Sequence, residues 1–117
     1  MSNPVVVTGD WHSTFVNDIH RDFDQASSPV VATEFVGTSI SSGGDGTDLP
    51  ERNRGVMAEN PFVRFCNVQR GYVSCSVTPQ GWQSDYQIVD FVTKKDAPKR
   101  TRASFLVADG RPGAQRV

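Results

Sequence analysis

The sequence predicts an α+β fold that is rich in short, mostly antiparallel strands and holds one or two short helices. The 117 residues include 10 glycines and 7 prolines, which divide the chain into short segments. The apolar runs between them are short and rich in β-branched residues, a pattern typical of strands rather than of a helical bundle. We expect one domain, or a fragment of one, over residues 1–117, because a domain typically takes roughly 100–200 residues.

The first half of the chain predicts two strands on either side of an ambiguous segment. Val5–Thr8 is a continuous apolar run, which is typical of a buried strand. Residues 30–36 are rich in β-branched side chains and predict a second strand. Residues 13–23 between them place apolar side chains at helical spacing but also alternate as a strand would. Helix and strand therefore both stay open for this segment.

A polar loop and a short helix follow. Residues 37–48 hold a run of serines and glycines and predict a loop. Asp48, with Glu51 three residues later, has the form of a capping box and predicts a short helix that runs to about Glu59. Asn60-Pro61 ends this helix, because the residue before a proline avoids helical backbone angles.

The last half predicts an antiparallel meander. Strands over residues 62–67 and 72–78 flank a tight turn at Gln69-Arg70-Gly71, where glycine can adopt a positive φ. Two further strands are expected over residues 86–93 and 102–108.

Two cysteines lie in the expected hairpin. With Arg70-Gly71 as its turn, Cys66 and Cys75 would face each other across the two strands. This position would allow a disulfide in an exported protein. Two reduced thiols in the core are the favoured interpretation, because a small cysteine on an apolar face behaves as a hydrophobic residue.

Charge and hydropathy argue against two classes of partner. The formal net charge is −1, and the dense basic group of Lys94, Lys95, Lys99, Arg100 and Arg102 is interpreted as a solvated turn rather than a nucleic-acid patch. No apolar run approaches the ~20 residues of a membrane span.

The first residues lack the charged and apolar regions of a signal peptide. Because the chain opens almost directly into a strand, we expect it to be a fragment of a longer protein.

The candidates for chemistry are Asp10 and His12, which follow the first strand within Gly9-Asp10-Trp11-His12-Ser13. Open sheets place ligand-binding residues at the C-terminal ends of strands. In an extended segment, residues two positions apart point to the same side, so both side chains would reach one metal centre. A carboxylate suits a hard cation, and an imidazole suits a transition metal. The alternative is an ordinary Gly-Asp turn with a histidine that hydrogen-bonds locally.

Several motifs recur in the order found in one family. They are Val-Val-Val-Thr-Gly-Asp-Trp-His-Ser at residues 5–13, Val16-Asn17-Asp18, and the segments 29–42, 60–61, 70–73, 77–79 and 82–86. Over nearly its whole length the chain resembles the C-terminal part of the PhoD-type alkaline phosphatases, within the calcineurin-like metallophosphoesterase superfamily.

The resemblance implies a fold and a metal site. The fold would be the β-rich C-terminal portion of a calcineurin-like sandwich, in which two packed sheets are flanked by helices. Asp10 would bind a divalent ion and His12 a ferric ion. Calcium and iron are the implied metals, and a carboxylate suits Ca²⁺ because this ion takes oxygen ligands. Asn17 and Asp18 would brace the ligand loop from outside the coordination sphere.

The resemblance also implies a function, the hydrolysis of a phosphate ester by a metal-activated water in a secreted or periplasmic protein. The family's other ligands, a cysteine, an Asp-x-x-Tyr element and a Gly-Asn-His/Asp element, do not occur in matching contexts here. Two protein ligands are fewer than a stable site generally needs. We therefore expect the isolated chain to be inactive, to lack the N-terminal part of its fold, and to self-associate. The alternative is a non-catalytic β-rich module for binding or assembly.

Overall fold

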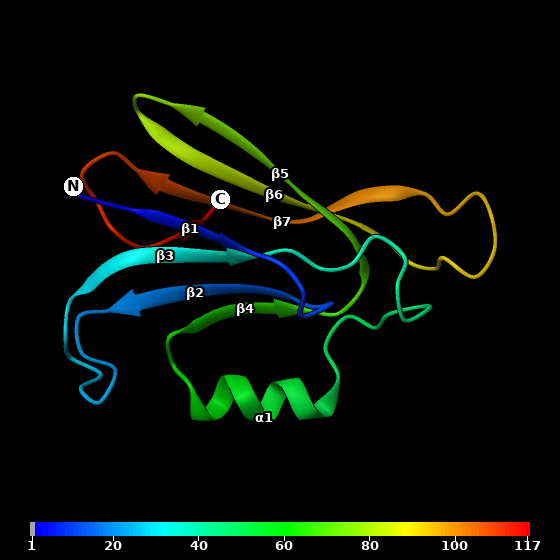
Figure 1. Cartoon of the computed structure of the whole chain (residues 1–117), viewed down its shortest axis with the longest axis horizontal. Helices are drawn as coiled ribbons and strands as arrows, with labels where there is room; N and C mark the ends of the chain where they lie inside the picture. Colours follow the sequence, from blue (N-terminus) through cyan, green and yellow to red (C-terminus); the bar gives the residue numbers. More distant parts are fainter. Residues whose placement is uncertain (1) are drawn as a thin grey trace.

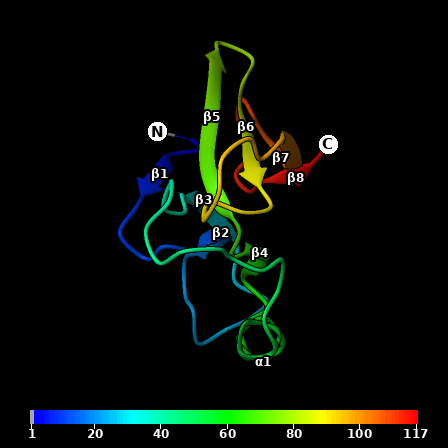
Figure 2. The same ribbon diagram turned by 90° about the vertical axis from the view of Figure 1, so that its right-hand side faces the viewer.

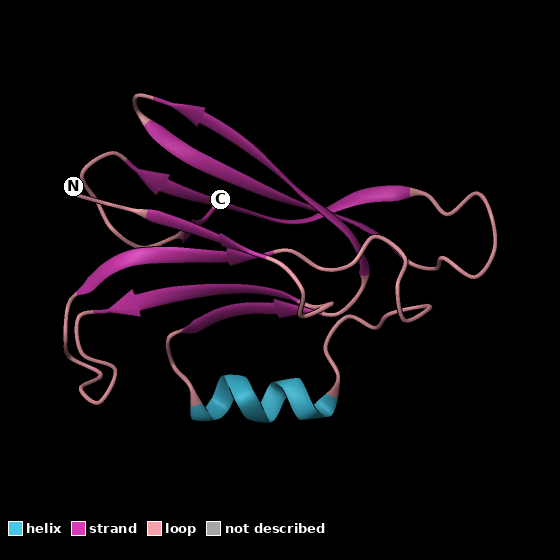
Figure 3. Cartoon of the chain, viewed as in Figure 1, coloured by secondary structure: helices cyan, strands magenta, loops and turns pink. Residues whose placement is uncertain are grey.

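Residues 2–117, which the computed structural model describes, form two four-stranded sheets and one helix (Figure 1; Figure 3). The elements in chain order are β1 (Val5–Thr8), β2 (Thr14–His20), β3 (Val30–Val36), α1 (Glu51–Glu59), β4 (Val63–Asn67), β5 (Arg70–Thr78), β6 (Gly81–Val89), β7 (Lys99–Ala108) and β8 (Gln115–Arg116). The predicted class, a β-rich α+β fold with mostly antiparallel strands, is confirmed.

The ambiguous segment is a strand. The first sheet has the order β1-β3-β2-β4, and β2 pairs antiparallel with both of its neighbours. Thr14, Val16 and Asp18 are buried, whereas the residues between them are half-buried. This alternation is what a strand with one face against a core requires. The pairing with β3 and β4, which lie far away in the sequence, decides between the two alternatives.

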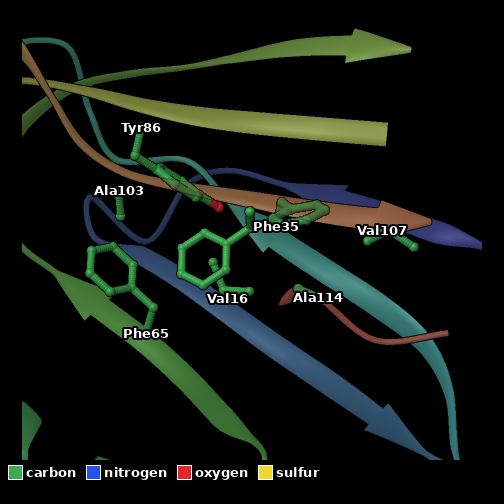
Figure 4. Close-up of a cluster of buried hydrophobic side chains, with 8 residues drawn as sticks. Val16, Phe35, Phe65, Tyr86, Ala103, Val107 and Ala114 are labelled. Carbon is green, nitrogen blue, oxygen red and sulfur yellow. The ribbon is translucent and has the colours of Figure 1, made fainter. Parts of the chain in front are cut away.

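The two sheets enclose an aromatic core. The second sheet has the order β5-β6-β7-β8, and the turned view of Figure 2 shows it beside the first sheet, with α1 beyond β4. Tyr86 and Phe105 meet edge to face with ring centroids 6.2 Å apart, which is a favourable aromatic geometry. The buried cluster consists of Val16, Phe35, Phe65, Tyr86, Ala103, Phe105, Val107 and Ala114 (Figure 4).

The predicted hairpin between residues 62–67 and 72–78 is wrong. β4 is an edge of the first sheet, whereas β5 lies in the second sheet and pairs with β6 across the turn at Pro79-Gln80. Gly71 therefore lies within β5 and not in a turn. A Cβ atom at this position would overlap the backbone carbonyl of Gln87 on β6, so the close approach of two strands requires the glycine.

This change of sheet separates the two cysteines. Cys66 is buried on β4 and accepts a hydrogen bond from Asn53 Nδ2 at 3.2 Å, whereas Cys75 is exposed on β5. Both are free thiols, so the interpretation as reduced cysteines is confirmed, but Cys75 does not lie in the core as predicted. Burial raises the pKa of the Cys66 thiol.

Some element ends differ from the prediction. Asp48 does not cap α1, because its carboxylate instead accepts hydrogen bonds from Arg102 and from Asn67. The strand expected to reach residue 93 ends at Val89, since the backbone N–H groups of residues 92 and 93 donate to the Asp45 carboxylate. Within residues 2–117, no helix has the length and apolar character that crossing a membrane requires.

β1 is an edge strand and not the buried strand that its apolar run predicted. It pairs, in parallel, with β3, and Val6 and Val7 are 43% and 62% exposed. β5 is the corresponding edge of the second sheet, and most of its side chains are exposed. Both sheets therefore end in strands with a free side.

Candidate functional site

The loop between β1 and β2, residues 9–13, carries the two predicted ligands, Asp10 and His12. We call it the ligand loop. The Trp11 N–H donates to the carbonyl of Gly9 at 2.9 Å and so closes a γ-turn centred on Asp10. Asp10 has a φ of 74° and His12 a φ of 54°. The segment is therefore not extended, and the expectation that an extended chain aligns the two side chains is wrong. The assignment of Asp10 and His12 as ligands stays a prediction.

The positive φ values of Asp10 and His12 are strained backbone conformations. Conformations of this kind cost about 1–3 kcal/mol each in non-glycine residues, and they cluster at binding and catalytic sites. The side chains of Asp10 and His12 are exposed, and neither makes a hydrogen bond to another part of residues 2–117. The loop therefore has an unfavourable backbone conformation, and it exposes a carboxylate and an imidazole that make no other contact of this kind.

Arg70 binds the backbone of this loop. The residue is 7% exposed, and its guanidinium donates from Nη1 to the carbonyl of His12 and from Nε to the carbonyl of Gly44, both at 2.8 Å. It forms no ion pair within the described part of the chain. Arg70 thus ties the ligand loop to the Ser/Gly loop. Its sequence position offered no signal for this role.

Asn17 is linked to the ligand loop through Glu34. Asn17 Nδ2 donates to one carboxylate oxygen of Glu34 at 2.9 Å, and Oγ1 of Thr8, at the end of β1, donates to the other at 2.7 Å. Asp18 forms an ion pair with Arg64 at 2.7 Å instead. A hydrogen-bonded route to the loop therefore exists for Asn17, and none from Asp18 is found among residues 2–117. Glu34 was not predicted, although a lone carboxylate in an apolar strand was an available signal.

Two carboxylates anchor the Ser/Gly loop. Asp48 accepts hydrogen bonds from Arg102 at 3.1 Å and from Asn67 at 2.7 Å, and the bond from Arg102 contributes most to lowering the pKa of Asp48. Asp45 accepts from the backbone N–H of Val92, which lowers the pKa of Asp45. Since Arg102 belongs to the basic group noted in the sequence, part of that group is neutralised by Asp48.

Asp10 and His12 carry atoms of the kind that bind metal ions, but the two side chains are too few for a complete metal site. Asp10 carries carboxylate oxygens, the ligand type that hard cations take, and His12 carries imidazole nitrogens, which suit a transition metal. Within residues 2–117, no three His, Cys, Asp or Glu side chains gather in a way that could hold a metal ion. Because a stable site generally needs more protein ligands than two, the loop can form part of such a centre but not the whole of it.

The chain resembles known proteins along its whole length. Residues 1–86 match the family described as PhoD-like phosphatase. The chain is 44% identical to Alkaline phosphatase D of Bacillus subtilis (strain 168) over 117 residues, which cover 100% of this chain and 20% of that protein. A solved structure described as "Structure of PhoD" superposes with a TM-score of 0.91 and 44% identity, covering 97% of this chain and 22% of that one. The chain spans about a fifth of the length of these relatives. It belongs to the PhoD-like phosphatase family.

Proposed function

We propose that this chain is the part of a PhoD-like phosphatase that brings Asp10 and His12 to a metal centre for phosphate-ester hydrolysis. The observation that carries the proposal is the strained loop over residues 9–13. Asp10 and His12 both have a positive φ and an exposed side chain, and Arg70 donates a hydrogen bond to the carbonyl of His12. Strained backbone of this kind clusters at binding and catalytic sites. Family membership supports the phosphatase chemistry.

Each residue of the loop and its support would have a distinct task. Asp10 would offer a carboxylate oxygen to a divalent cation such as calcium, and His12 an imidazole nitrogen to iron. Bound cations of this kind lower the pKa of a water molecule and hold phosphoryl oxygens for in-line attack. Asn17 would orient the loop through Glu34, and Arg70 would hold the backbone of His12.

The isolated chain would not be an active enzyme. It spans 20% of the B. subtilis relative, and within residues 2–117 no third metal-binding side chain gathers with the pair. The remaining ligands would come from the preceding part of the same fold. As the family resemblance implies, the whole protein would act as a secreted or periplasmic enzyme.

A chimera tests the proposal, with this chain replacing the matching segment of the B. subtilis enzyme. Asp10→Ala and His12→Ala should each lower p-nitrophenyl phosphate hydrolysis by more than the roughly 10–100-fold that loss of a supporting residue costs. Metal content measured by mass spectrometry should fall as well. After metal has been removed from the variants and from the unmodified chimera, their melting temperatures should be equal, because these side chains contribute to metal binding rather than to packing.

Asp24→Ala, which removes an exposed carboxylate from the β2–β3 loop, is the matched control and should change neither activity nor metal content. Full activity and metal content in either ligand variant would contradict the assignment. Turnover by the unmodified 117-residue chain that is lost on chelation would contradict the expected inactivity of the isolated segment.

A further inference from the structure

The guanidinium of Arg70 keeps one free edge. Its Nε and Nη1 atoms donate to the carbonyls of Gly44 and His12, and the residue forms no ion pair within residues 2–117. Nη2 makes no hydrogen bond in this part of the chain, and it is not one of the buried atoms that lack a partner, so solvent reaches it. A charge on a side chain that is only 7% exposed is costly without a counter-ion. The free edge of Arg70 therefore favours an anion.

This edge lies beside the ligand loop. β1 and β3 run parallel, so the ligand loop after β1 and the Ser/Gly loop after β3, residues 37–48, leave the first sheet at the same end (Figure 1). Arg70 joins the two loops. Because its Nη1 binds the carbonyl of His12, Nη2 of the same planar group is close to the backbone of a proposed metal ligand. An anion bound to Nη2 would therefore lie next to the ligand loop.

Gly43 borders the free edge. The Gly44 N–H donates to the carbonyl of Ser41 at 3.3 Å and closes a turn in which Gly43 has a φ of 86°. A Cβ atom at Gly43 would lie 3.0 Å from Nη2 of Arg70, so a side chain there would crowd this atom. Gly44 has a similar φ of 72°, but a Cβ atom at its position would meet no atom within 4 Å. The two glycines therefore differ in their relation to Nη2 and not in their backbone.

A phosphate group suits such a site. An arginine edge binds phosphoryl oxygens through charge-assisted hydrogen bonds, which are stronger than those between neutral groups. We propose that Nη2 of Arg70 binds an oxygen of the phosphoryl group of the substrate, in addition to the hydrogen bond that Arg70 gives to the ligand loop. The assignment to the substrate rests on the proposed phosphatase function, whereas phosphate binding at Nη2 requires no metal.

Phosphate binding by the 117-residue chain tests the site without metal or turnover. Inorganic phosphate, titrated at constant ionic strength, should shift the side-chain NMR signals of Arg70 in a saturable way. Gly43→Asn should weaken this binding roughly tenfold, because asparagine tolerates a positive φ but its side chain crowds Nη2. Gly44→Asn makes the same demand on the backbone and should bind phosphate as the unmodified chain does. Absence of saturation, or the same affinity in both variants, would overturn the site.

A carboxylate in place of the phosphate tests the need for an anion. Gly43→Asp brings a carboxylate to Nη2, whereas Gly43→Asn has the same shape without the charge. The Asp variant should therefore melt at a higher temperature than the Asn variant. The corresponding pair at Gly44 is the control and should show a smaller difference, since that side chain would not border Nη2. A difference at position 43 that is no larger than the one at position 44 would overturn the proposal.

The full-length chimera decides whether the phosphate belongs to the ester. Gly43→Asn should lower kcat/KM for p-nitrophenyl phosphate and raise the inhibition constant of inorganic phosphate, with unchanged metal content. An unchanged kcat/KM would show a site for free phosphate, and a loss of metal would show a disturbed ligand loop. Either result would overturn the assignment to the substrate. An inactive unmodified chimera would contradict the proposed function and this assignment with it, whereas the titration of the chain would still decide the phosphate site.

Discussion

Arg70 is the side chain that joins the most separate parts of the proposed site. Its guanidinium binds backbone carbonyls of His12 and Gly44, which are 58 and 26 residues away in the sequence. A buried arginine usually has an acidic partner, and Arg70 has none within residues 2–117. Hydrogen bonds to two loop carbonyls take that place. Arg70 therefore connects folding stability to the geometry of the ligand loop.

Replacing Arg70 should reveal this connection. Arg70→Met removes both hydrogen bonds and should lower the free energy of unfolding by about 2 kcal/mol, since a single hydrogen bond to a charged group contributes about 1.5–3 kcal/mol and relief from burying the charge offsets part of the loss. Arg70→Lys keeps the charge but not the planar fork, so it should fall in between. Urea denaturation measures both. Arg54→Met, at an exposed position of α1, is the control, and an equal loss there would contradict the prediction.

Asp48 makes part of the stability dependent on pH. Its folded pKa is lowered from the ordinary value of 3.8, mainly by Arg102. Its contribution is therefore fully present above pH 3.8 and is lost as the pH falls through the lower, folded pKa. Asp48→Asn should reduce the free energy of unfolding at pH 7 by about 0.5–1 kcal/mol, because the pair is partly exposed.

The difference between Asp48→Asn and the unmodified chain should shrink in strong acid. Urea titrations at pH 7 and in steps below pH 4 measure it. Asp24→Asn, at an exposed loop position without such a partner, should leave stability unchanged at every pH. A pH-independent effect of the Asp48 substitution would count against the pair with Arg102.

At the scale of elements, the corner between β4 and β5 determines the architecture. Asn67 and Gln69 are buried there, with Asn67 Nδ2 donating to Gln69 Oε1 and the Gln69 N–H donating to Asn67 Oδ1, both at 3.0 Å. Gln69 also donates to Asp90 at 2.9 Å. These bonds satisfy polar groups where the chain leaves one sheet and enters the other. The corner therefore takes the place of a hairpin turn.

The two thiols should differ in reactivity because this corner sends them to different sheets. Cys66 is 4% exposed with a raised thiol pKa, whereas Cys75 is exposed. In the native chain, iodoacetamide at pH 8 should label Cys75 quickly and Cys66 only on unfolding, since the thiolate is the reactive form. Peptide mapping by mass spectrometry identifies the labelled residue. Equal labelling rates would contradict the separation, and Cys75→Ser, which should abolish the fast phase, is the control.

At the scale of the whole molecule, each sheet ends in an open strand. β1 exposes Val6 and Val7, and β5 exposes Val77, which is 62% exposed. Unpaired strand edges with apolar side chains favour association with other strands. The isolated chain is therefore expected to self-associate.

Sedimentation velocity tests this expectation. The 117-residue chain should sediment as a dimer or a larger species at high concentration. Val7→Lys and Val77→Lys should shift it toward the monomer, because a lysine on an edge strand opposes pairing. Val117→Lys, at an exposed position outside β1 and β5, should not. A chain that stays monomeric at high concentration would contradict the expectation.

The sequence by itself determined the features that depend on neighbours along the chain. Short β-branched runs predicted β1 and β3, because strand preference resides in consecutive side chains. The motif around Asp10 and His12 and the matches that follow it identified the family, since they occur in a fixed order. The class of the fold and the family could therefore be predicted before any tertiary contact was known.

The tertiary structure alone decided everything that depends on distant partners. It made residues 14–20 a strand through pairing with β3 and β4, and it placed β4 and β5 in different sheets. It brought Glu34 to Thr8 and Arg70 to His12, contacts that span 26 and 58 residues. Local patterns carry no information on which remote donor meets which acceptor. The supports of the ligand loop therefore become visible only when the two sheets are assembled.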